Sequence, residues 1–401
     1  MSTVRAAGTG AVQRLVILLC AVLLGVQVVR SAAVAGLAEG APQSAAKLWP
    51  GHPAVETQLG MVAIALATGK RLPIPDGVIA DVTIAALKAP LAPEPYLVRG
   101  VQAQLDGQSA LARAAFLAAE RRDPRSLPAH YFLAEQDLRN GNVGHGLDEV
   151  AALATLAPGG VSQAAPFIAT FARDRRNWPA VRALFRRNPQ LATSALTAMA
   201  SNAANADAVV SLSDPAMRGA ASLWLPPLLQ SLIAAGDYAK ARSIWAEVAK
   251  VRAAPGDELY DAAFAQPSAP PPFNWALTSS SVGLAERQSN GRLHAIFYGQ
   301  QNGPLARQLL MLKPGAYRLS QRAAGDPAQL ASLMWTLTCV RASDAVARID
   351  VATAARAPWM FVVPASCPAQ WLELAGVSSD IVRQSEVTIS DLKLTRAGNG
   401  S

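Results

Sequence analysis

Residues of the types used in catalysis are few in this sequence. Its four histidines are spread along the chain, at His52, His130, His145 and His294. None belongs to a His-Glu-x-x-His zinc motif, and no Gly-x-Ser-x-Gly nucleophile turn is present. The Gly-Lys pair at residues 69–70 lacks the glycine spacing of a phosphate-binding loop. These absences predict a protein that is not an enzyme and has no catalytic residue, metal or cofactor.

Two pairs of adjacent acids are the remaining candidates for catalysis. Glycosidases use two carboxylates that flank one sugar bond. Asp148 and Glu149, like Asp257 and Glu258, are neighbours in segments with a helical pattern. Adjacent positions on a helix point about 100° apart, so neither pair is well placed to share one substrate. The pairs are better explained as solvated helix surface.

A group of arginines is the most concentrated charge in the chain. Six lie within 15 residues and are opposed only by Asp174: Arg173, Arg175, Arg176, Arg182, Arg186 and Arg187. With a net charge of +8, such a group could contact lipid head groups or an anionic polymer. The alternative is a solvated helix face that complements the helix dipole. Nucleic acid is not expected as a partner, because no known binding module is present.

Three aromatic residues near the C-terminus could contact a glycan: Tyr298, Tyr317 and Trp371. Flat aromatic rings cover the apolar faces of sugars and lose little side-chain entropy on binding. Each ring could instead pack inside the protein, and for Tyr317 core packing is the stronger expectation. Trp335 shares a strand face with Leu333, Leu337 and Cys339, and Trp359 shares one with Phe361 and Val363, so both are expected in the core.

Cys339 and Cys367 are the two cysteines outside the apolar N-terminal segment, which contains Cys20. In an oxidising compartment they could form a disulfide bond. Burial as two free thiols is an equally open alternative. A zinc site is disfavoured, because the two are 28 residues apart with no other cysteine or histidine nearby.

The N-terminus contains a strongly apolar segment, residues 15–29, between Arg14 and Arg30. Arginines and no acids precede it, which predicts that residues 1–14 stay in the cytoplasm and that the rest is exported. The segment is rather short for a membrane span, although alanine-rich flanks can lengthen it.

Whether this segment is retained is a separate question. Ala33-Val34-Ala35 offers a signal-peptidase site, but Arg30 lies between it and the apolar run, where a charge is unfavourable. We expect an uncleaved single-pass anchor in a bacterial inner membrane, with residues 36–401 in the periplasm. The alternative is a secreted or periplasmic protein released by cleavage.

Residues 95–158 contain the same sequence pattern twice. Matching residues of the two copies are 34 positions apart: Gly107 with Gly141, Pro124 with Pro158, Ala112 with Gly146 and Phe116 with Val150. A third copy in residues 228–251 keeps the same mutual spacing at Gly236, Ala241 and Trp245. His130 stands where the first copy has Tyr96, which indicates a packing role.

The pattern indicates pairs of closely packed helices. A glycine lets the chain reverse, a small residue follows where the helices cross, and a large apolar residue fills the groove between them. A proline then ends the second helix. Residues 61–264 therefore resemble the tetratricopeptide repeat, a helix–turn–helix unit of about 34 residues. The resemblance implies a concave surface that binds protein partners.

The helical pattern ends at a proline-rich segment, residues 265–272, which we expect to be a linker. Beyond it apolar and polar residues alternate, as in β-strands. The expected strands cover residues 273–277, 292–298, 307–312, 316–322, 332–341, 359–364, 370–376 and 386–396. Short strands separated by turns predict an antiparallel sandwich over residues 273–397.

The order of these strands resembles the galactose-binding-like jelly roll, the fold of many carbohydrate-binding modules. The Pro314-Gly315 turn before Tyr317 and the closing strand VTISDLKLTR (387–396) carry the resemblance. It implies that the sandwich could bind a glycan. Ser390-Asp391 stands where the family often has two acids, which leaves a structural calcium site open.

These features predict a multidomain chain of a membrane segment (1–36), a linker (37–60), all-α helical repeats (61–264) and an all-β jelly roll. We expect a non-enzymatic envelope scaffold whose repeats bind proteins and whose sandwich could bind glycan, in the assembly or export of a surface polysaccharide. A scaffold for proteins alone, with a purely structural sandwich, is the alternative. A glycan-active enzyme is the third.

Overall fold

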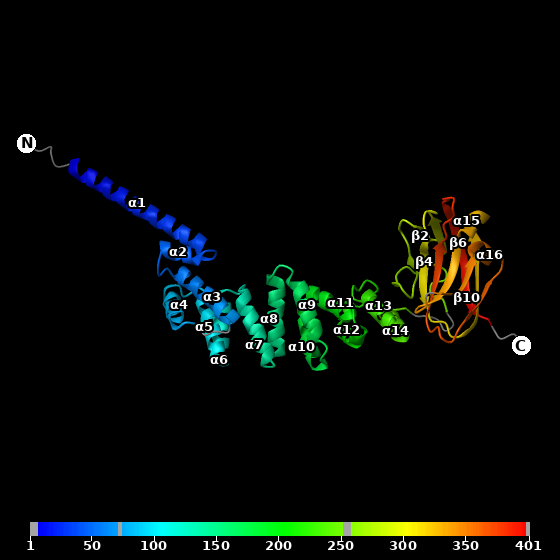
Figure 1. Ribbon diagram of the computed structural model, residues 1–401, viewed down its shortest axis with the longest axis horizontal. Helices are drawn as coiled ribbons and strands as arrows, with labels where there is room; N and C mark the ends of the chain where they lie inside the picture. Colours follow the sequence, from blue (N-terminus) through cyan, green and yellow to red (C-terminus); the bar gives the residue numbers. More distant parts are fainter. Residues whose placement is uncertain (1–6, 71–73, 252–257, 343, 398–401) are drawn as a thin grey trace, which may run out of the picture. The chain divides into compact units, whose positions relative to one another are not determined.

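The computed structural model describes residues 7–70, 74–251, 258–342 and 344–397. The first six residues of the expected cytoplasmic tip therefore lie outside the described residues. The chain forms two compact units, divided between Ala164 and Ala165. The first is helical, and the second contains helices followed by an antiparallel β-sandwich (Figure 1).

The first unit consists of helices joined by short turns. They are α1 (Ala7–Ala38), α2 (Pro42–Leu48), α3 (Pro53–Lys70), α4 (Asp76–Lys88), α5 (Glu94–Leu105), α6 (Ser109–Arg122), α7 (Leu127–Arg139) and α8 (Val143–Leu156), and α9 (Gly160–Phe171) crosses the division. Residues 37–60, expected to be a linker, instead contain α2 and the start of α3. Alanine-rich sequence favours helix, and a proline is tolerated at the first position of each of these two helices.

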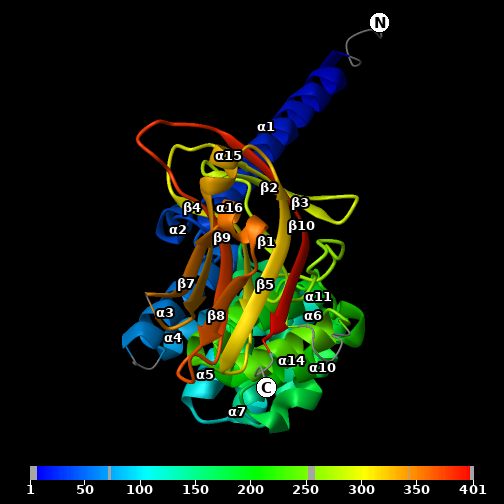
Figure 2. The ribbon, with the colours of Figure 1, turned by 90° about the vertical axis from the view of Figure 1, so that its right-hand side faces the viewer.

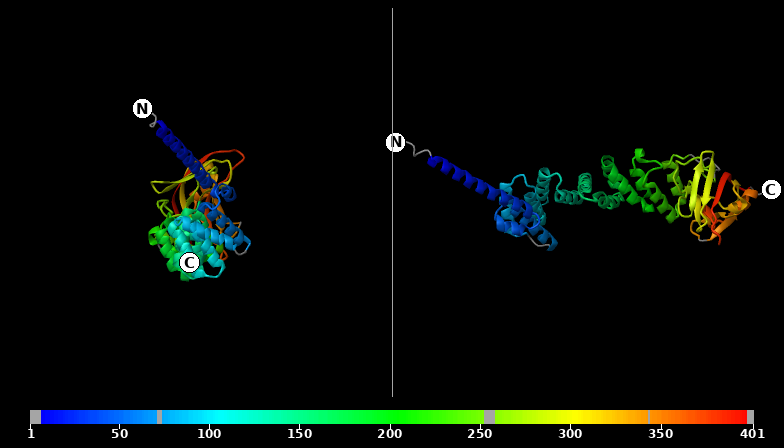
Figure 3. Two further views of the ribbon diagram at one scale, coloured as in Figure 1. Left: turned by 90° about the vertical axis from the view of Figure 1, so that its left-hand side faces the viewer. Right: turned by 90° about the horizontal axis from the view of Figure 1, so that it is seen from above.

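The long helix α1 contains the apolar segment (Figure 3). Within the described residues it is the one helix long and apolar enough to cross a membrane, over Gln13–Ala38, with a mean hydropathy of 2.3. Its last turns differ from the rest, because Val34 is fully buried against Ala45 of α2 and Val55 of α3. The end of α1 is therefore packed into the first unit.

Two consecutive helix pairs, α5–α6 and α7–α8, contain the repeated pattern. The chain reverses at Gly107 and Gly141, whose φ angles of 73° and 78° suit glycine. Phe116 is buried against Gly100, where any Cβ would overlap its ring. The other members of the pattern take the expected places: Ala112 and Val150 are buried, and Pro124 and Pro158 lie in the turns after α6 and α8.

The second unit begins with further helices. They are η1 (Arg175–Asn177), α10 (Trp178–Arg187), α11 (Pro189–Ala200), η2 (Ala203–Asn205), α12 (Ala206–Leu212), η3 (Pro215–Met217), α13 (Leu225–Ala235) and α14 (Tyr238–Val248). The pair α13–α14 contains the third copy of the pattern. Gly236 has a φ of 87°, and Ala241 and Trp245 are buried.

The sandwich consists of two five-stranded antiparallel sheets. Sheet A has the order β1 (Ala276–Leu277), β4 (Gly303–Leu310), β9 (Gln370–Gly376), β6 (Leu333–Cys339) and β7 (Ala345–Asp350). Sheet B has the order β2 (Gly283–Gln288), β3 (Arg292–Phe297), β10 (Ser385–Arg396), β5 (Gly315–Ala324) and β8 (Trp359–Val363). The short helices α15 (Pro327–Ala331) and α16 (Val351–Arg356) lie against the strands (Figure 2).

Each expected strand overlaps an observed one, and Trp335 and Trp359 lie in the core as predicted. The expectation missed β2 and β7. The sequences GLAERQ and AVARID each contain two charged residues and few large apolar ones, so their period of two is weak. Their pairing with β3 and β6 makes them strands.

Residues 258–275 connect α14 to the sandwich and contain no helix or strand. Residues 258–264 were expected to belong to the helical repeats, but Leu259 and Phe264 lie in the sandwich core. Asp261 and Phe264 have positive φ angles, which a helix cannot accommodate. The carboxylate of Asp261 is nearly fully buried and accepts hydrogen bonds from the backbone N–H groups of Ala265 and Gln266.

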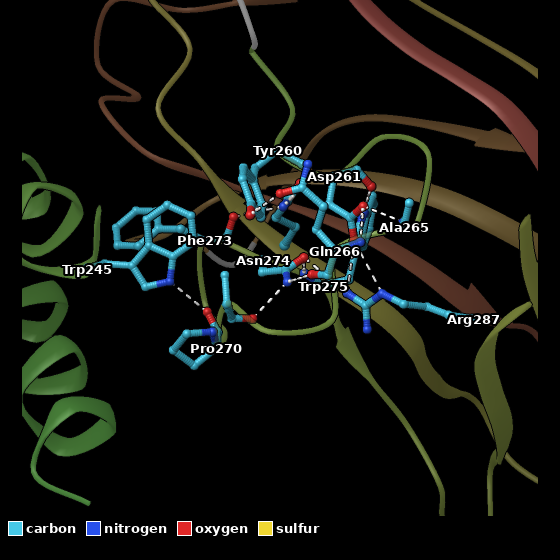
Figure 4. A network of polar contacts seen from close by, with 12 residues as sticks. Trp245, Tyr260, Asp261, Ala265, Gln266, Pro270, Phe273, Asn274, Trp275 and Arg287 are labelled. Carbon is cyan, nitrogen blue, oxygen red and sulfur yellow. Dashed lines mark hydrogen bonds and ion pairs between the residues drawn. The ribbon is translucent and has the colours of Figure 1, made fainter. Parts of the chain in front are cut away.

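The same network reaches the strands and α14 (Figure 4). Arg287 of β2 pairs with Asp261 at 3.2 Å, and the Trp275 indole donates to the Asp261 carbonyl at 3.1 Å. The Trp245 indole of α14 donates to the Pro270 carbonyl at 2.7 Å. The proline-rich segment is therefore packed against both α14 and the sandwich.

We expect Asp261→Ala to lower the free energy of unfolding of the sandwich by about 3–5 kcal/mol, because Arg287 would lose its buried partner. Urea unfolding of the full chain, followed by tryptophan fluorescence, measures this loss. The matched control is Asp174→Ala, since exposed Asp174 caps η1 by accepting from Arg176 N–H. Its expected loss is about 1 kcal/mol or less. Equal losses in the two variants would contradict the assigned role of Asp261.

Candidate functional site

The outer face of sheet A is the surface of the sandwich best suited to bind a ligand. Along β9 the buried residues Leu372 and Leu374 belong to the sandwich core. Successive side chains of a strand point to opposite faces, so Trp371 and Glu373 lie on the outer face. Both are half-buried, which leaves part of each side chain accessible.

Strand register places a row of polar residues across this face. Arg307 of β4 lies opposite Glu373, which lies opposite Thr336 of β6, and Thr336 lies opposite Arg348 of β7. Arg307 and Arg348 are exposed. The row therefore offers positive donors at both ends, with a carboxylate and a hydroxyl between them.

Trp371 lies in the neighbouring row, opposite Thr338 of β6. The guanidinium of Arg307 lies over its ring, 5.0 Å from the ring centre. This cation–π contact links the two rows and restricts the orientation of both side chains. We name Arg307, Trp371, Glu373, Thr336 and Thr338 the sheet A platform.

Two opposing influences act on the Glu373 carboxyl of the platform. Burial raises the pKa of Glu373, and the positive charge of Arg307 opposes this rise. The cross-strand neighbours of Glu373 are Arg307 and Thr336.

The other two aromatic candidates do not join Trp371. Tyr317 takes the core position that was the stronger expectation, which rules it out as a glycan contact: its side chain is fully buried in sheet B, it stacks on Phe361, and its hydroxyl donates to the Lys313 carbonyl. Tyr298 follows β3 in sheet B and is 37% exposed. Its neighbours Phe297 and Gly299 line a separate groove of about 910 Å³ beside α15.

The arginine group lies on and just before helix α10. Val181, Leu184 and Phe185 of α10 are buried, so the arginines of this helix lie on its solvent side. All six residues predicted from the sequence are exposed: Arg173, Arg175, Arg176, Arg182, Arg186 and Arg187. Arg175 lies over the Trp178 ring at 5.4 Å. Contact of this surface with an anionic partner stays a prediction.

Cys339 and Cys367 are joined by a disulfide bond, with their Cα atoms 5.4 Å apart. Cys339 ends β6 and pairs with Gln370, the residue before Trp371. The bond therefore restrains the chain immediately beside the sheet A platform. Cys20 is the free cysteine, exposed on α1.

Sequence reasoning named Trp371 but missed the remaining platform residues. Arg307 and Glu373 were visible only as polar positions within apolar strands. Their relation depends on β4 pairing with β9 across more than 60 residues of chain, as Arg307 and Glu373 do. Alternation along the expected strand 370–376 already places Glu373 on the face of Trp371, whereas Arg307 joins that face only through this pairing.

Comparison with known proteins adds little. No family model matches the chain, and a search of curated proteins found no match. A chain from a crystal structure of accessory secretory proteins 1, 2 and 3 of Streptococcus pneumoniae is similar at 11% identity and a TM-score of 0.23. The match covers 30% of this chain and 89% of that one. Similarity at this level carries no argument.

The disulfide predicts a simple labelling result. In denaturant without reductant, alkylation should modify Cys20 alone, and after reduction it should modify all three cysteines. Mass spectrometry measures the number of alkylated cysteines in protein purified from the oxidising compartment, with free thiols alkylated at lysis. Three modified cysteines before reduction would favour two buried free thiols instead.

Proposed function

We propose that the protein is a non-enzymatic scaffold anchored in the bacterial inner membrane, whose sandwich binds glycan and whose helical repeats bind protein partners. In this proposal it acts in the assembly or export of a surface polysaccharide. The observation that carries the glycan part is the sheet A platform, where Trp371 lies beside Arg307 and Glu373.

The platform combines the two kinds of contact that a sugar needs. The ring of Trp371 can cover the apolar face of a pyranose, which aromatic side chains do at small entropic cost. Sugar hydroxyls both donate and accept hydrogen bonds. Arg307 donates, Glu373 accepts when ionised, and the threonine hydroxyls do both. The jelly-roll resemblance of the sandwich agrees with this use of the fold, although fold alone is weak support.

The packing of α1 supports an uncleaved anchor. The Arg30 guanidinium lies over the Trp49 ring at 4.2 Å, and its Nε donates to the Leu48 carbonyl at 3.0 Å. Cleavage after Ala35 would remove these contacts together with buried Val34. In this proposal the end of α1 belongs to the folded exported part, and the preceding apolar turns span the membrane.

A groove on the helical unit supports protein binding. It lies beside α5 and α6, has a volume of about 390 Å³ and is lined in part by Arg99, Gln102 and Leu111. Leu111 is 61% exposed, so an apolar side chain of a partner could bury it. Tetratricopeptide-like repeats would present such a groove to a peptide.

A scaffold for proteins alone, with a purely structural sandwich, is the second candidate. The observation that favours it is the edge strand β8 of sheet B, where Met360 and Val362 are 57% and 65% exposed. The unpaired backbone groups of an edge strand can hydrogen-bond to a strand of another protein, and its exposed apolar side chains can pack against that protein. A glycan-active enzyme remains the third candidate and has no such support.

Trp371→Ala should weaken glycan binding at least about tenfold, which is about 1.4 kcal/mol. Trp371→Phe should retain part of the affinity, because a smaller ring still stacks. The measurement is binding of the full chain in detergent to an array of bacterial polysaccharides, followed by titration with the best ligand.

The matched control is Tyr298→Ala, an exposed aromatic residue on the other sheet, which should bind as the unchanged protein does. Thermal unfolding confirms that each variant folds. Loss of binding in Tyr298→Ala alone would move the site to the groove beside α15. Failure of the unchanged protein to bind any glycan would favour the scaffold for proteins alone.

The anchor makes a separate prediction. Protein extracted from bacterial membranes should retain its N-terminus through Ala35, as measured by intact mass and N-terminal peptide mapping. Val34→Asp should also lower the thermal unfolding temperature of the first unit, because it would place a carboxylate in the buried contact with Ala45 and Val55. A mature chain that begins near residue 36 would contradict the anchor.

A further inference from the structure

Three side chains from consecutive helices meet inside the first unit. They are Glu120 of α6, His130 of α7 and Glu149 of α8. One potential ligand atom from each lies within 4.8 Å of the other two. The residues are 10 and 19 positions apart in the chain, so no sequence motif joins them.

His130 is held in the orientation of a metal-binding imidazole. Its side chain is 6% exposed, and its Nε2 lies 2.9 Å from the Pro124 carbonyl. A carbonyl can only accept, so Nε2 carries a proton. Metal-bound histidines commonly donate one ring N–H to a carbonyl in this way, which aims the other nitrogen at the metal.

The other nitrogen of His130 faces a carboxylate. Nδ1 lies 2.6 Å from Glu149 Oε2, and the carboxylate of Glu120 completes the cluster. In the described part of the chain, neither glutamate forms an ion pair with a lysine or arginine, and the nearby Asp137 is paired with Arg113. Two carboxylates therefore face one imidazole.

We propose that Glu120, His130 and Glu149 bind a divalent transition-metal ion of the Zn²⁺ class. Imidazole and carboxylate are ligands that zinc accepts, and three protein ligands leave room for water. Ligand atoms about 2.1 Å from a tetrahedral metal are roughly 3.4 Å apart. The His130–Glu149 contact would open and Glu120 would approach, each by about an ångström or somewhat more.

The bound ion would connect the two repeats. Glu120 belongs to the first helix pair, and His130 and Glu149 belong to the second. A metal that ties α6 to α7 and α8 stabilises the folded unit by its binding free energy. This inference is independent of glycan binding.

Substitution of Glu120 distinguishes a metal site from an ordinary buried ion pair. The pair needs only His130 and Glu149, which are in direct contact. Glu120→Gln should therefore leave the metal-free protein about as stable as before, because it removes both the repulsion of Glu149 and the attraction of the His130 ring. A metal site, in contrast, loses one of three ligands.

The test uses the full chain in detergent, stripped with chelator and titrated with Zn²⁺ by calorimetry, with thermal unfolding in parallel. We expect one equivalent to bind and to raise the unfolding temperature of the first unit. Glu120→Gln should weaken zinc binding at least about tenfold and abolish this rise. Glu149→Gln should do the same and also lower the stability of the metal-free protein.

The matched control is Glu135→Gln, since Glu135 lies on α7 and pairs with Arg139 on the helix surface. It should bind zinc as the unchanged protein does. Zinc binding that is equal in the Glu120→Gln and Glu135→Gln variants would overturn the proposal. So would the absence of any zinc-induced shift, and the cluster would then be a buried ion pair.

Discussion

The buried carboxylate of Asp261 ties the irregular segment before the sandwich to strand β2. The segment that carries it is irregular, so its backbone polar groups need partners other than a helix or a sheet ladder. Asp261 accepts two of its N–H groups and pairs with Arg287 of β2. A charge can remain in such a place only when it is paired and hydrogen-bonded, so these contacts fix the segment around Asp261 against the sandwich.

The proline-rich segment, expected to be a linker, is packed in place. Four prolines remove helix as an option, but they do not make a flexible tether. Ala269 and Phe273 are buried, and the Pro270 carbonyl accepts from Trp245 of α14. Helix pair and sandwich in the second unit are therefore packed together. A scaffold proposed to present a binding face benefits from a support that moves little.

The two helix pairs of the repeated pattern use one equivalent position for different contacts. In the first pair, Gly100 lets Phe116 pack close to α5. In the second pair, His130 stands where the first pair has Tyr96, and its ring contacts Glu149. The first pair uses the position differently, since Arg122 donates to the Tyr96 hydroxyl and covers its ring. One repeat scaffold thus accommodates an aromatic–cation contact in one copy and a carboxylate–imidazole cluster in the next.

Local sequence was enough to predict the helix pairs, the strands with strong alternation and the apolar segment of α1. Each of these depends on residues that are close in the chain: a glycine at a turn, a proline after a helix, or apolar residues every second position. It was not enough for α2, for the packed segment around Asp261, or for β2 and β7, whose structure depends on partners elsewhere. The same limit applies to the sites. Trp371 could be named as a candidate from its residue type. That Arg307 lies beside Glu373, and Glu120 beside His130, could not be predicted, because tertiary packing brings each pair together. Chemistry that requires several side chains at one point is decided by strand register and helix crossing, which no local pattern in this chain encodes.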